Sequence, residues 1–301
     1  MALHIFWQPT GVNLDQLGQS KHIENSDGDT PKIEMPIRML SMDTPEKKNV
    51  TSGLSKAEIE QFWPQLPGWF DSGDSPVPGP LADYLKPRVA RATAWQTHWD
   101  QGAESTDALN SFMDQRLTRP TGTRRRLFLR AADERFDRYG RLLAYVAPSY
   151  DADERADMTR YERRTFNFQM VEMGWAPTLM IYPSIPNERD LPMLQQAAQK
   201  AVEEQRGHWA DDLLLLAYEY RMLEKLVLIL QKQQLGETID NEQYFGWVTR
   251  YCCDISDGLI YPPADYWRVA PWNRLFIWPD DIRAAVADLN LRPAPEFATP
   301  I

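Results

Sequence analysis

The chain has 301 residues and a formal net charge of −10, enough sequence for one domain with a substantial appendage. Its 43% hydrophobic and 25% charged residues are typical of a globular protein and argue against general disorder. No stretch reaches the ~20 apolar residues of a membrane span, and the two adjacent cysteines, Cys252 and Cys253, offer no disulfide framework.

Strands, turns and helices are expected over the first 210 residues, followed by a mainly helical region. Strands are identified by short apolar runs between turn residues, and helices by apolar residues at i, i+3 and i+4. In chain order the expected elements are a turn at Asp27–Asp29; strands at Thr30–Met35 and Ile37–Met42; a proline-broken inserted loop at Pro45–Pro80; helices at Tyr84–Trp99 and Thr106–Leu117; strands at Arg126–Ala131 and Leu142–Ala147 around a turn at Asp137–Gly140; and helices at Ala156–Gly174, Leu191–Trp209, Leu213–Gln234, Asn241–Cys253 and Asp280–Leu289.

Charge divides the chain into two unequal parts. Residues 115–141 hold nine Arg and three acidic residues, whereas residues 211–301 hold fourteen acidic and eight basic residues. A basic working face beside an acidic appendage reconciles nucleic-acid binding with a negative total charge. We therefore expect a domain at 1–210, with a Pro-rich and helical insertion at about 47–104, and a helical, aromatic-rich region at 211–301.

Three acidic residues lie at the ends of short strand-like segments, where loops can gather them into one site: Asp29, Asp43 and Glu46. Converging carboxylates repel one another unless a cation lies between them, and oxygen ligands suit Ca²⁺ or Mg²⁺ better than Zn²⁺. Arg38 and Arg141 add guanidinium groups, which stabilise the charge of a phosphodiester under attack. The residue types thus indicate phosphodiester chemistry at a metal site.

The spacing of Arg38 and Asp43 places one condition on this site. Residues five apart point to opposite faces of a regular strand. A bulge or a strand end is therefore expected before Asp43, and Asp43-Thr44-Pro45 is a suitable place for the strand to stop.

Together and in this order, the charged motifs resemble those of the staphylococcal nuclease (thermonuclease) family. They read Asp27-Gly28-Asp29-Thr30, then Arg38, then Asp43-Thr44-Pro45-Glu46, then Asp137-Arg138-Tyr139-Gly140-Arg141. Only Arg138 departs from the family motifs, which have Lys there. A weaker resemblance continues through Asn167, Gly174, Ala176, Tyr182 and Trp209. The resemblance covers roughly residues 20–211.

The resemblance implies an α+β fold, an OB-fold-like five-stranded β-barrel with packed helices. It also implies a Ca²⁺ ion bound by the carboxylates of Asp29 and Asp43 and by the backbone carbonyl of Thr44. Glu46 becomes the candidate general base, and Arg38 and Arg141 become the groups that bind the scissile phosphate.

On the substrate side, the resemblance places Tyr139 and Tyr182 at the nucleotide pocket. The Arg-rich segment adds Arg124, Arg125 and Arg138 as expected contacts to the nucleic-acid backbone. The family cuts DNA and RNA with little sequence preference and leaves 3′-phosphate ends, so DNA and/or RNA is the expected partner.

Two other functions fit the same sequence. One is a non-catalytic, nuclease-like module that binds nucleic acid or protein, and the other is a nuclease restrained by a protein partner on residues 211–301. Such binding modules normally lose the metal and arginine positions, and all five charged positions are present here, which favours the enzyme. The N-terminus shows no secretory signal, so a cytoplasmic protein without a membrane association is expected.

Overall fold

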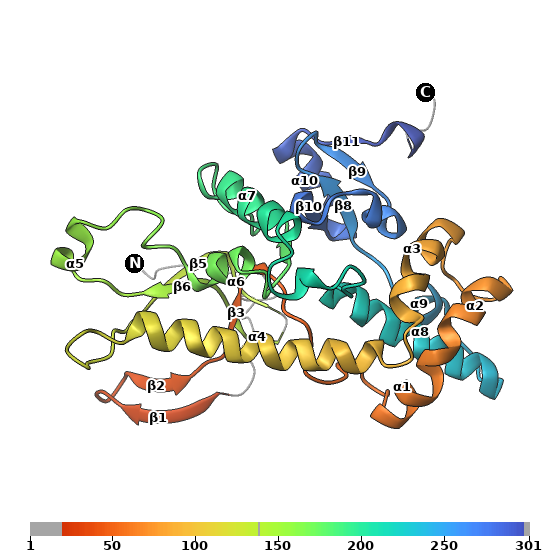
Figure 1. Ribbon diagram of the computed structural model, residues 1–301, viewed down its shortest axis with the longest axis horizontal. Helices are drawn as coiled ribbons and strands as arrows, with labels where there is room; N and C mark the ends of the chain where they lie inside the picture. The colour runs from red at the N-terminus through yellow and green to blue at the C-terminus, as the bar shows by residue number, and fades with distance from the viewer. Residues whose placement is uncertain (1–19, 138, 298–301) are drawn as a thin grey trace, which may run out of the picture.

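A computed structural model describes residues 20–137 and 139–297 of the chain (Figure 1). The helices are α1 Lys56–Phe62, α2 Leu66–Ser72, α3 Gly79–Val89, α4 Ala94–Leu117, α5 Ala152–Ala156, α6 Phe166–Glu172, α7 Asp190–Glu203, α8 Ala217–Leu235, α9 Asn241–Phe245 and α10 Ile282–Leu289. The strands are β1 Lys21–Asn25, β2 Pro31–Glu34, β3 Ile37–Met39, β4 Ser41–Met42, β5 Leu127–Phe136, β6 Leu142–Pro148, β7 Thr178–Ile181, β8 Tyr251–Asp254, β9 Leu259–Tyr261, β10 Arg274–Ile277 and β11 Arg292–Pro293. None of the helices in these two ranges is long and apolar enough to cross a membrane.

The fold is α+β, but its strands form separate sheets instead of a closed barrel. One sheet is the β1–β2 hairpin, one has the order β3-β6-β5, and one has the order β11-β9-β8-β10-β7-β4. The chain bends at Ser41, where φ is 60°, so that β3 stays beside β6 while β4 turns away to pair with β7. The expected five-stranded barrel is therefore wrong for the described residues, because closure requires one continuous ring of paired strands.

The six-stranded sheet joins the two ends of the chain. Strand β10 pairs in parallel with β7 and antiparallel with β8, and β7 pairs in turn with β4. The C-terminal region thus adds four strands to this sheet beside its helices, and the expectation of a mainly helical region did not include these strands. Residues 241–253, expected as one helix, form α9 and then β8, because pairing with β10 fixes Tyr251–Asp254 as a strand. The boundary near residue 210 stays a prediction.

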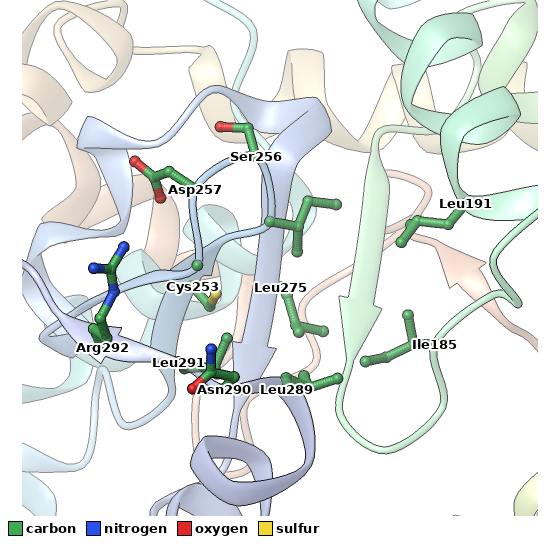
Figure 2. Close-up of a pocket in the computed structure, with 12 residues that line it drawn as sticks. Ile185, Leu191, Cys253, Ser256, Asp257, Leu275, Leu289, Asn290, Leu291 and Arg292 are labelled. Carbon is green, nitrogen blue, oxygen red and sulfur yellow. The ribbon is translucent and has the colours of Figure 1, made fainter.

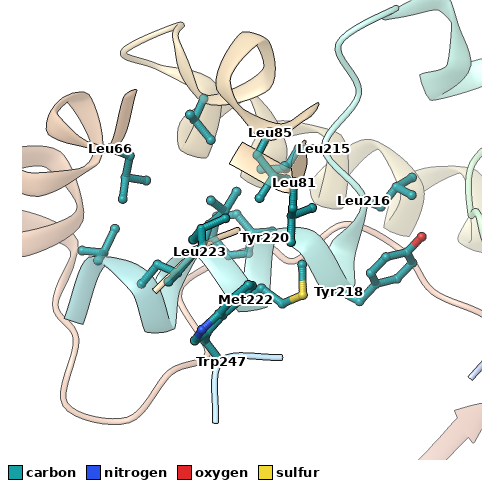
Figure 3. Packing of buried hydrophobic residues seen from close by; sticks show 14 of the residues in the cluster. Leu66, Leu81, Leu85, Leu215, Leu216, Tyr218, Tyr220, Met222, Leu223 and Trp247 are labelled. Carbon is teal, nitrogen blue, oxygen red and sulfur yellow. The ribbon is translucent and has the colours of Figure 1, made fainter. Parts of the chain in front are cut away.

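The proline-rich insertion is helical where a loop is expected. Pro64, Pro67 and Pro80 lie in the first turns of a 3₁₀ helix, α2 and α3. Proline is tolerated there because first-turn N–H groups have no partner within the helix. Helices α1 to α3 share one apolar cluster with α8, part of which Figure 3 shows, including Leu66, Leu81, Leu85, Tyr220 and Leu223.

Helix α4 is continuous where two helices are expected, and it crosses the loop after β4. Gly102 lies within it, and a Cβ atom there would lie 2.5 Å from the backbone oxygen of Glu46. Glycine therefore permits the close approach of α4 to the Pro45–Glu46 backbone. In contrast, the helix expected at Ala156–Gly174 forms only over its second part, α6, which Thr165 caps by accepting a hydrogen bond from the backbone N–H of Phe168 (3.1 Å).

A buried asparagine joins helix α6 to strand β6 and to the residue before the β3–β4 bend. The Asn167 side chain accepts a hydrogen bond from the backbone N–H of Val146 (2.9 Å). Its amide nitrogen donates to the carbonyl oxygens of Leu40 (2.9 Å) and Ala144 (3.2 Å). Asn167 is only 2% exposed, so no water can replace these bonds. Its amide therefore fixes α6, β6 and the residue before the bend to one another.

We expect Asn167→Ala to lower the free energy of unfolding by about 1–3 kcal/mol, because it leaves buried backbone groups without partners. Denaturant unfolding followed by circular dichroism measures this change. The control is Asn110→Ala, the same substitution at an exposed position of helix α4. Equal stability losses in the two variants would contradict the role given to Asn167.

Candidate active site

The bend between β3 and β4 brings Arg38 and Asp43 together. The Arg38 Nη2 atom lies 2.6 Å from Asp43 Oδ1, although regular strand geometry would send these side chains to opposite faces. The left-handed backbone at Ser41 interrupts the strand between them. The strand break that the spacing requires is therefore present at Ser41, the first residue of β4.

Asp43 is a buried carboxylate held by two guanidinium groups. Its exposed fraction is 1%, and its second oxygen, Oδ2, lies 2.6 Å from Nη2 of Arg221 on helix α8. Burial alone would raise the pKa of Asp43, but the positive charges of Arg221 and Arg38 lower it to about 2. Asp43 is therefore a carboxylate at neutral pH.

Glu46 contacts the same arginine. Its Oε1 atom lies 2.7 Å from Nη1 of Arg221, so one guanidinium group bridges both carboxylates. Burial acts against the charge of Arg221, yet Asp43 and Glu46 together raise its pKa. The result is a half-buried cluster in which each acidic side chain faces an arginine.

His98 fixes the backbone of Glu46. The backbone N–H of Glu46 donates to His98 Nε2 (3.0 Å), and His98 Nδ1 lies 3.1 Å from the carbonyl oxygen of Leu215. These partners assign the imidazole proton to Nδ1. The ring stacks on Tyr220, with centroids 4.2 Å apart, and burial lowers the pKa of His98 to about 3. A neutral histidine thus ties the Glu46 loop to the start of α8.

Arg141 lies in the turn before β6 and pairs with its own turn. Its Nη2 atom lies 2.6 Å from Asp137 Oδ2, and Asp137 also accepts hydrogen bonds from the turn backbone. In the parallel register, Arg38 faces Leu143, which is two residues from Arg141. Arg141 thus lies one position before the first pair of this register, Ile37 with Leu142, at the end of the β3–β6 pair that carries Arg38.

Asp29 makes no hydrogen bond with Asp43 or Glu46 in the described part of the chain. It is exposed in the turn of the β1–β2 hairpin, and its carboxylate accepts a hydrogen bond from Thr30 (3.0 Å). Thr44 is half-buried beside Asp43. Among the described residues, no three His, Cys, Asp or Glu side chains come together as a metal site would require. The metal roles of Asp29, Asp43 and Thr44 stay predictions.

This arrangement does not fit a calcium ion. Calcium takes six to eight oxygen ligands, but both oxygens of Asp43 and one oxygen of Glu46 already accept hydrogen bonds from arginines. A divalent ion would also lie beside two positive guanidinium groups, which repel it.

The other predicted substrate contacts have local partners. Arg124 pairs with Asp114 (2.8 Å), and Arg125 pairs with Glu154 (2.7 Å). The Tyr182 hydroxyl donates to Asp288 on α10. Tyr139 is 65% exposed, with its ring centroid 5.4 Å from the guanidinium of Arg141. Arg138 lies outside the described residues.

Sequence patterns do not identify Arg221 or Arg250 as site residues. Arg221 lies between Glu219 and Glu224 in the mostly buried first half of α8, a pattern that indicates buried polar contacts but names no partner for the arginine. The Arg250 guanidinium lies over the rings of Phe276 and Trp278, 5.1 and 5.2 Å from their centroids. Burial, together with the positive charge of Arg221, lowers the pKa of Arg250 to about 10.

A separate cavity of about 510 Å³ opens between β8, β10 and α10 (Figure 2). Its walls are mostly apolar, with Leu191, Leu275 and Leu291 among them, and Asp257 and Arg292 also line it. No predicted site residue lines this cavity. The arginine–carboxylate cluster, with its charged side chains, is therefore the better candidate for phosphodiester chemistry.

The state of His98 predicts a pH dependence of stability. The folded protein keeps His98 neutral down to about pH 3, whereas an unfolded chain protonates it below its ordinary pKa of 6.5. Stability should therefore be complete above pH 6.5 and fall as the pH drops towards 3, with a slope of about 1.4 kcal/mol per pH unit.

Denaturant unfolding at a series of pH values from 7.5 to 4.5 measures this slope. His98→Gln should unfold with a shallower slope than the wild type, because its side chain does not titrate. His208, whose pKa burial lowers to about 4, contributes to the slope in both proteins. Identical slopes would show that His98 is not the titrating group.

Comparison with known proteins adds to this geometry. Residues 82–211 match the family model described as Staphylococcal nuclease homologue. The chain is also 28% identical over 153 residues to Endonuclease YhcR of Bacillus subtilis (strain 168). That alignment covers 50% of this chain and 10% of the relative, so the chain spans a small part of the relative's length. The family match contains Tyr139 and Arg141 but begins after Glu46 and ends before Arg221. The chain therefore contains a staphylococcal nuclease homologue domain at residues 82–211.

Proposed function

We propose that this chain hydrolyses phosphodiester bonds of nucleic acid, with DNA and/or RNA as substrate. Membership of residues 82–211 in the nuclease family and the similarity to an endonuclease support the proposal. The observation that carries it is the 2.6 Å contact between Arg38 and Asp43, with Glu46 on the same loop. This contact joins two of the charged motifs from which phosphodiester chemistry is expected.

The proposed chemistry uses arginines for the phosphate and a carboxylate for the water. Attack of water on a phosphodiester adds negative charge to the phosphoryl oxygens, and guanidinium groups stabilise that charge. Arg38 on β3 and Arg141 in the turn before β6 are proposed to bind these oxygens. Glu46 is proposed to accept the proton of the attacking water. The P–O5′ bond then breaks, Arg141 stabilises the charge on the leaving 5′-oxygen, and this oxygen takes a proton from solvent, so that one product ends in a 3′-phosphate and the other in a 5′-hydroxyl.

The substrate is proposed to lie along the Arg-rich strand and its turn. Arg124, Arg125 and Arg138 would contact the backbone phosphates, which attract positive side chains without regard to sequence. The exposed ring of Tyr139 suits stacking against a base, and Tyr182 is the second aromatic residue of the proposed nucleotide pocket.

Calcium is the cofactor that the family resemblance implies. The described carboxylates do not fit it, because arginines occupy their oxygens, so no step of the proposed reaction is assigned to an ion. The metal requirement is therefore measured directly in the cleavage experiment.

We expect the full chain to shorten end-labelled DNA or RNA. The substrates are incubated with Ca²⁺, with Mg²⁺ or with a chelator, and the products are resolved on a denaturing gel. Treatment with a phosphatase that removes 3′-phosphates should change the mobility of the products. Binding without cleavage in all three conditions would favour the non-catalytic nucleic-acid-binding module instead.

Arg141→Ala should lower kcat by about 100-fold or more, which is the usual effect of removing one donor to a developing negative charge. Its stability should change little, because the Arg141 side chain is 39% exposed and its ion pair among the described residues is with Asp137 of the same turn. Single-turnover cleavage and thermal melting measure the two effects.

Arg292→Ala is the matched control for this variant. Arg292 is exposed on β11, which lies at the opposite edge of the six-stranded sheet from β4. The control should keep the activity of the wild type. An Arg141→Ala variant that retains half of that activity would remove Arg141 from the proposed reaction.

A further inference from the structure

Helix α8 brings a positive charge into the middle of the carboxylate pair. One guanidinium group reaches both side chains: Arg221 Nη2 lies 2.6 Å from Asp43 Oδ2, and Nη1 lies 2.7 Å from Glu46 Oε1. Nη1 also lies 3.4 Å from Asp43 Oδ1, the oxygen that Arg38 binds at 2.6 Å. Arg221 thus lies between the carboxylates, where a shared metal ion would have to lie.

We propose that Arg221 is the resident cation of the Asp43–Glu46 pair, so that this pair binds no divalent ion while Arg221 is in place. The arginine cluster around it then serves a phosphate group of the substrate. The statement about the phosphate group rests on the proposed function, whereas the statement that Arg221 excludes a divalent ion concerns only the residues of the folded chain.

Both partners of this contact are fixed by buried structure. Along α8, Arg221 is flanked by the buried side chains of Tyr220 and Met222, which belong to the apolar cluster shown in part in Figure 3. The Asp43 backbone N–H donates to the Pro177 carbonyl oxygen (3.0 Å), and His98 holds Glu46. An ion could displace Arg221 only by leaving its guanidinium, whose side chain is 27% exposed, without its two partners.

The charge of the cluster also opposes a metal ion. Asp43 and Glu46 carry two negative charges, and Arg38 and Arg221 carry two positive charges. Arg250 adds a third positive charge near enough to Arg221, Asp43 and Arg38 to interact with their charges. It makes no ion pair or hydrogen bond with any residue that the structure describes, and its contacts are the rings of Phe276 and Trp278. A net positive cluster attracts a phosphate and repels a divalent cation.

The test is a set of thermal melts of the full chain with and without millimolar CaCl₂, at matched ionic strength. The wild type should show no calcium-dependent shift of Tm. In Arg221→Met, the freed carboxylates should bind calcium, so its Tm should rise by several degrees on adding CaCl₂. This gain should disappear in the double variant Asp43→Asn, Arg221→Met. Arg292→Met controls for the loss of an arginine elsewhere and should show no gain.

Two results would overturn the proposal. One is a calcium shift in the wild type that Asp43→Asn abolishes, and the other is a folded Arg221→Met variant that gains no calcium shift. If Arg221→Met does not fold, the wild type and Asp43→Asn still decide the question. These melts do not involve cleavage, so a wild type that cuts no nucleic acid and binds no calcium refutes the proposed function without refuting the role of Arg221.

Discussion

A buried carboxylate must be neutralised, and in this protein the neutralisation of Asp43 determines how distant parts of the chain meet. Asp43 is 1% exposed, and its two oxygens bind Arg38 and Arg221. Removing one partner of such a group leaves an uncompensated charge in a poorly solvated place, which destabilises a fold strongly. The strand that carries Arg38 and the helix that carries Arg221 are therefore bound to one another through a single side chain.

The remaining architecture keeps those two elements in position. The six-stranded sheet pairs β4 with β7 and β7 with β10, while the helices of the insertion pack on α8. Gly102 and His98, both on α4, contact the backbone of the Glu46 loop. The insertion and the C-terminal region thus surround the site and are not simple appendages to it. The family match at residues 82–211 covers α4 with His98 and Gly102 but not α1, α2 or α8, to which this packing also gives a physical role.

Local patterns predicted the parts of the site that depend on nearby residues. The break between Arg38 and Asp43 follows from strand alternation over five residues, and Ser41 provides it. The barrel failed as a prediction because strand order depends on which distant strands compete for each edge. Arg221 was missed for a similar reason, since it lies 178 residues after Asp43 and nothing in its local sequence names that partner. Asp29 was grouped with Asp43 by a motif, but its position depends on how the β1–β2 hairpin docks.

The pairing of β10 with β7 has a consequence for the protein as it is synthesised. A chain emerges from the ribosome N-terminus first, and domains fold as their residues become available. When residues 82–211 have emerged, the segment that matches the nuclease family is complete, but Arg221, Arg250 and β10 are still to come. The Asp43 carboxylate then has only Arg38 as a partner. The nascent chain therefore passes through a stage in which the Asp43–Glu46 pair lacks its arginine from α8, and β10 completes the sheet only after that arginine has been released.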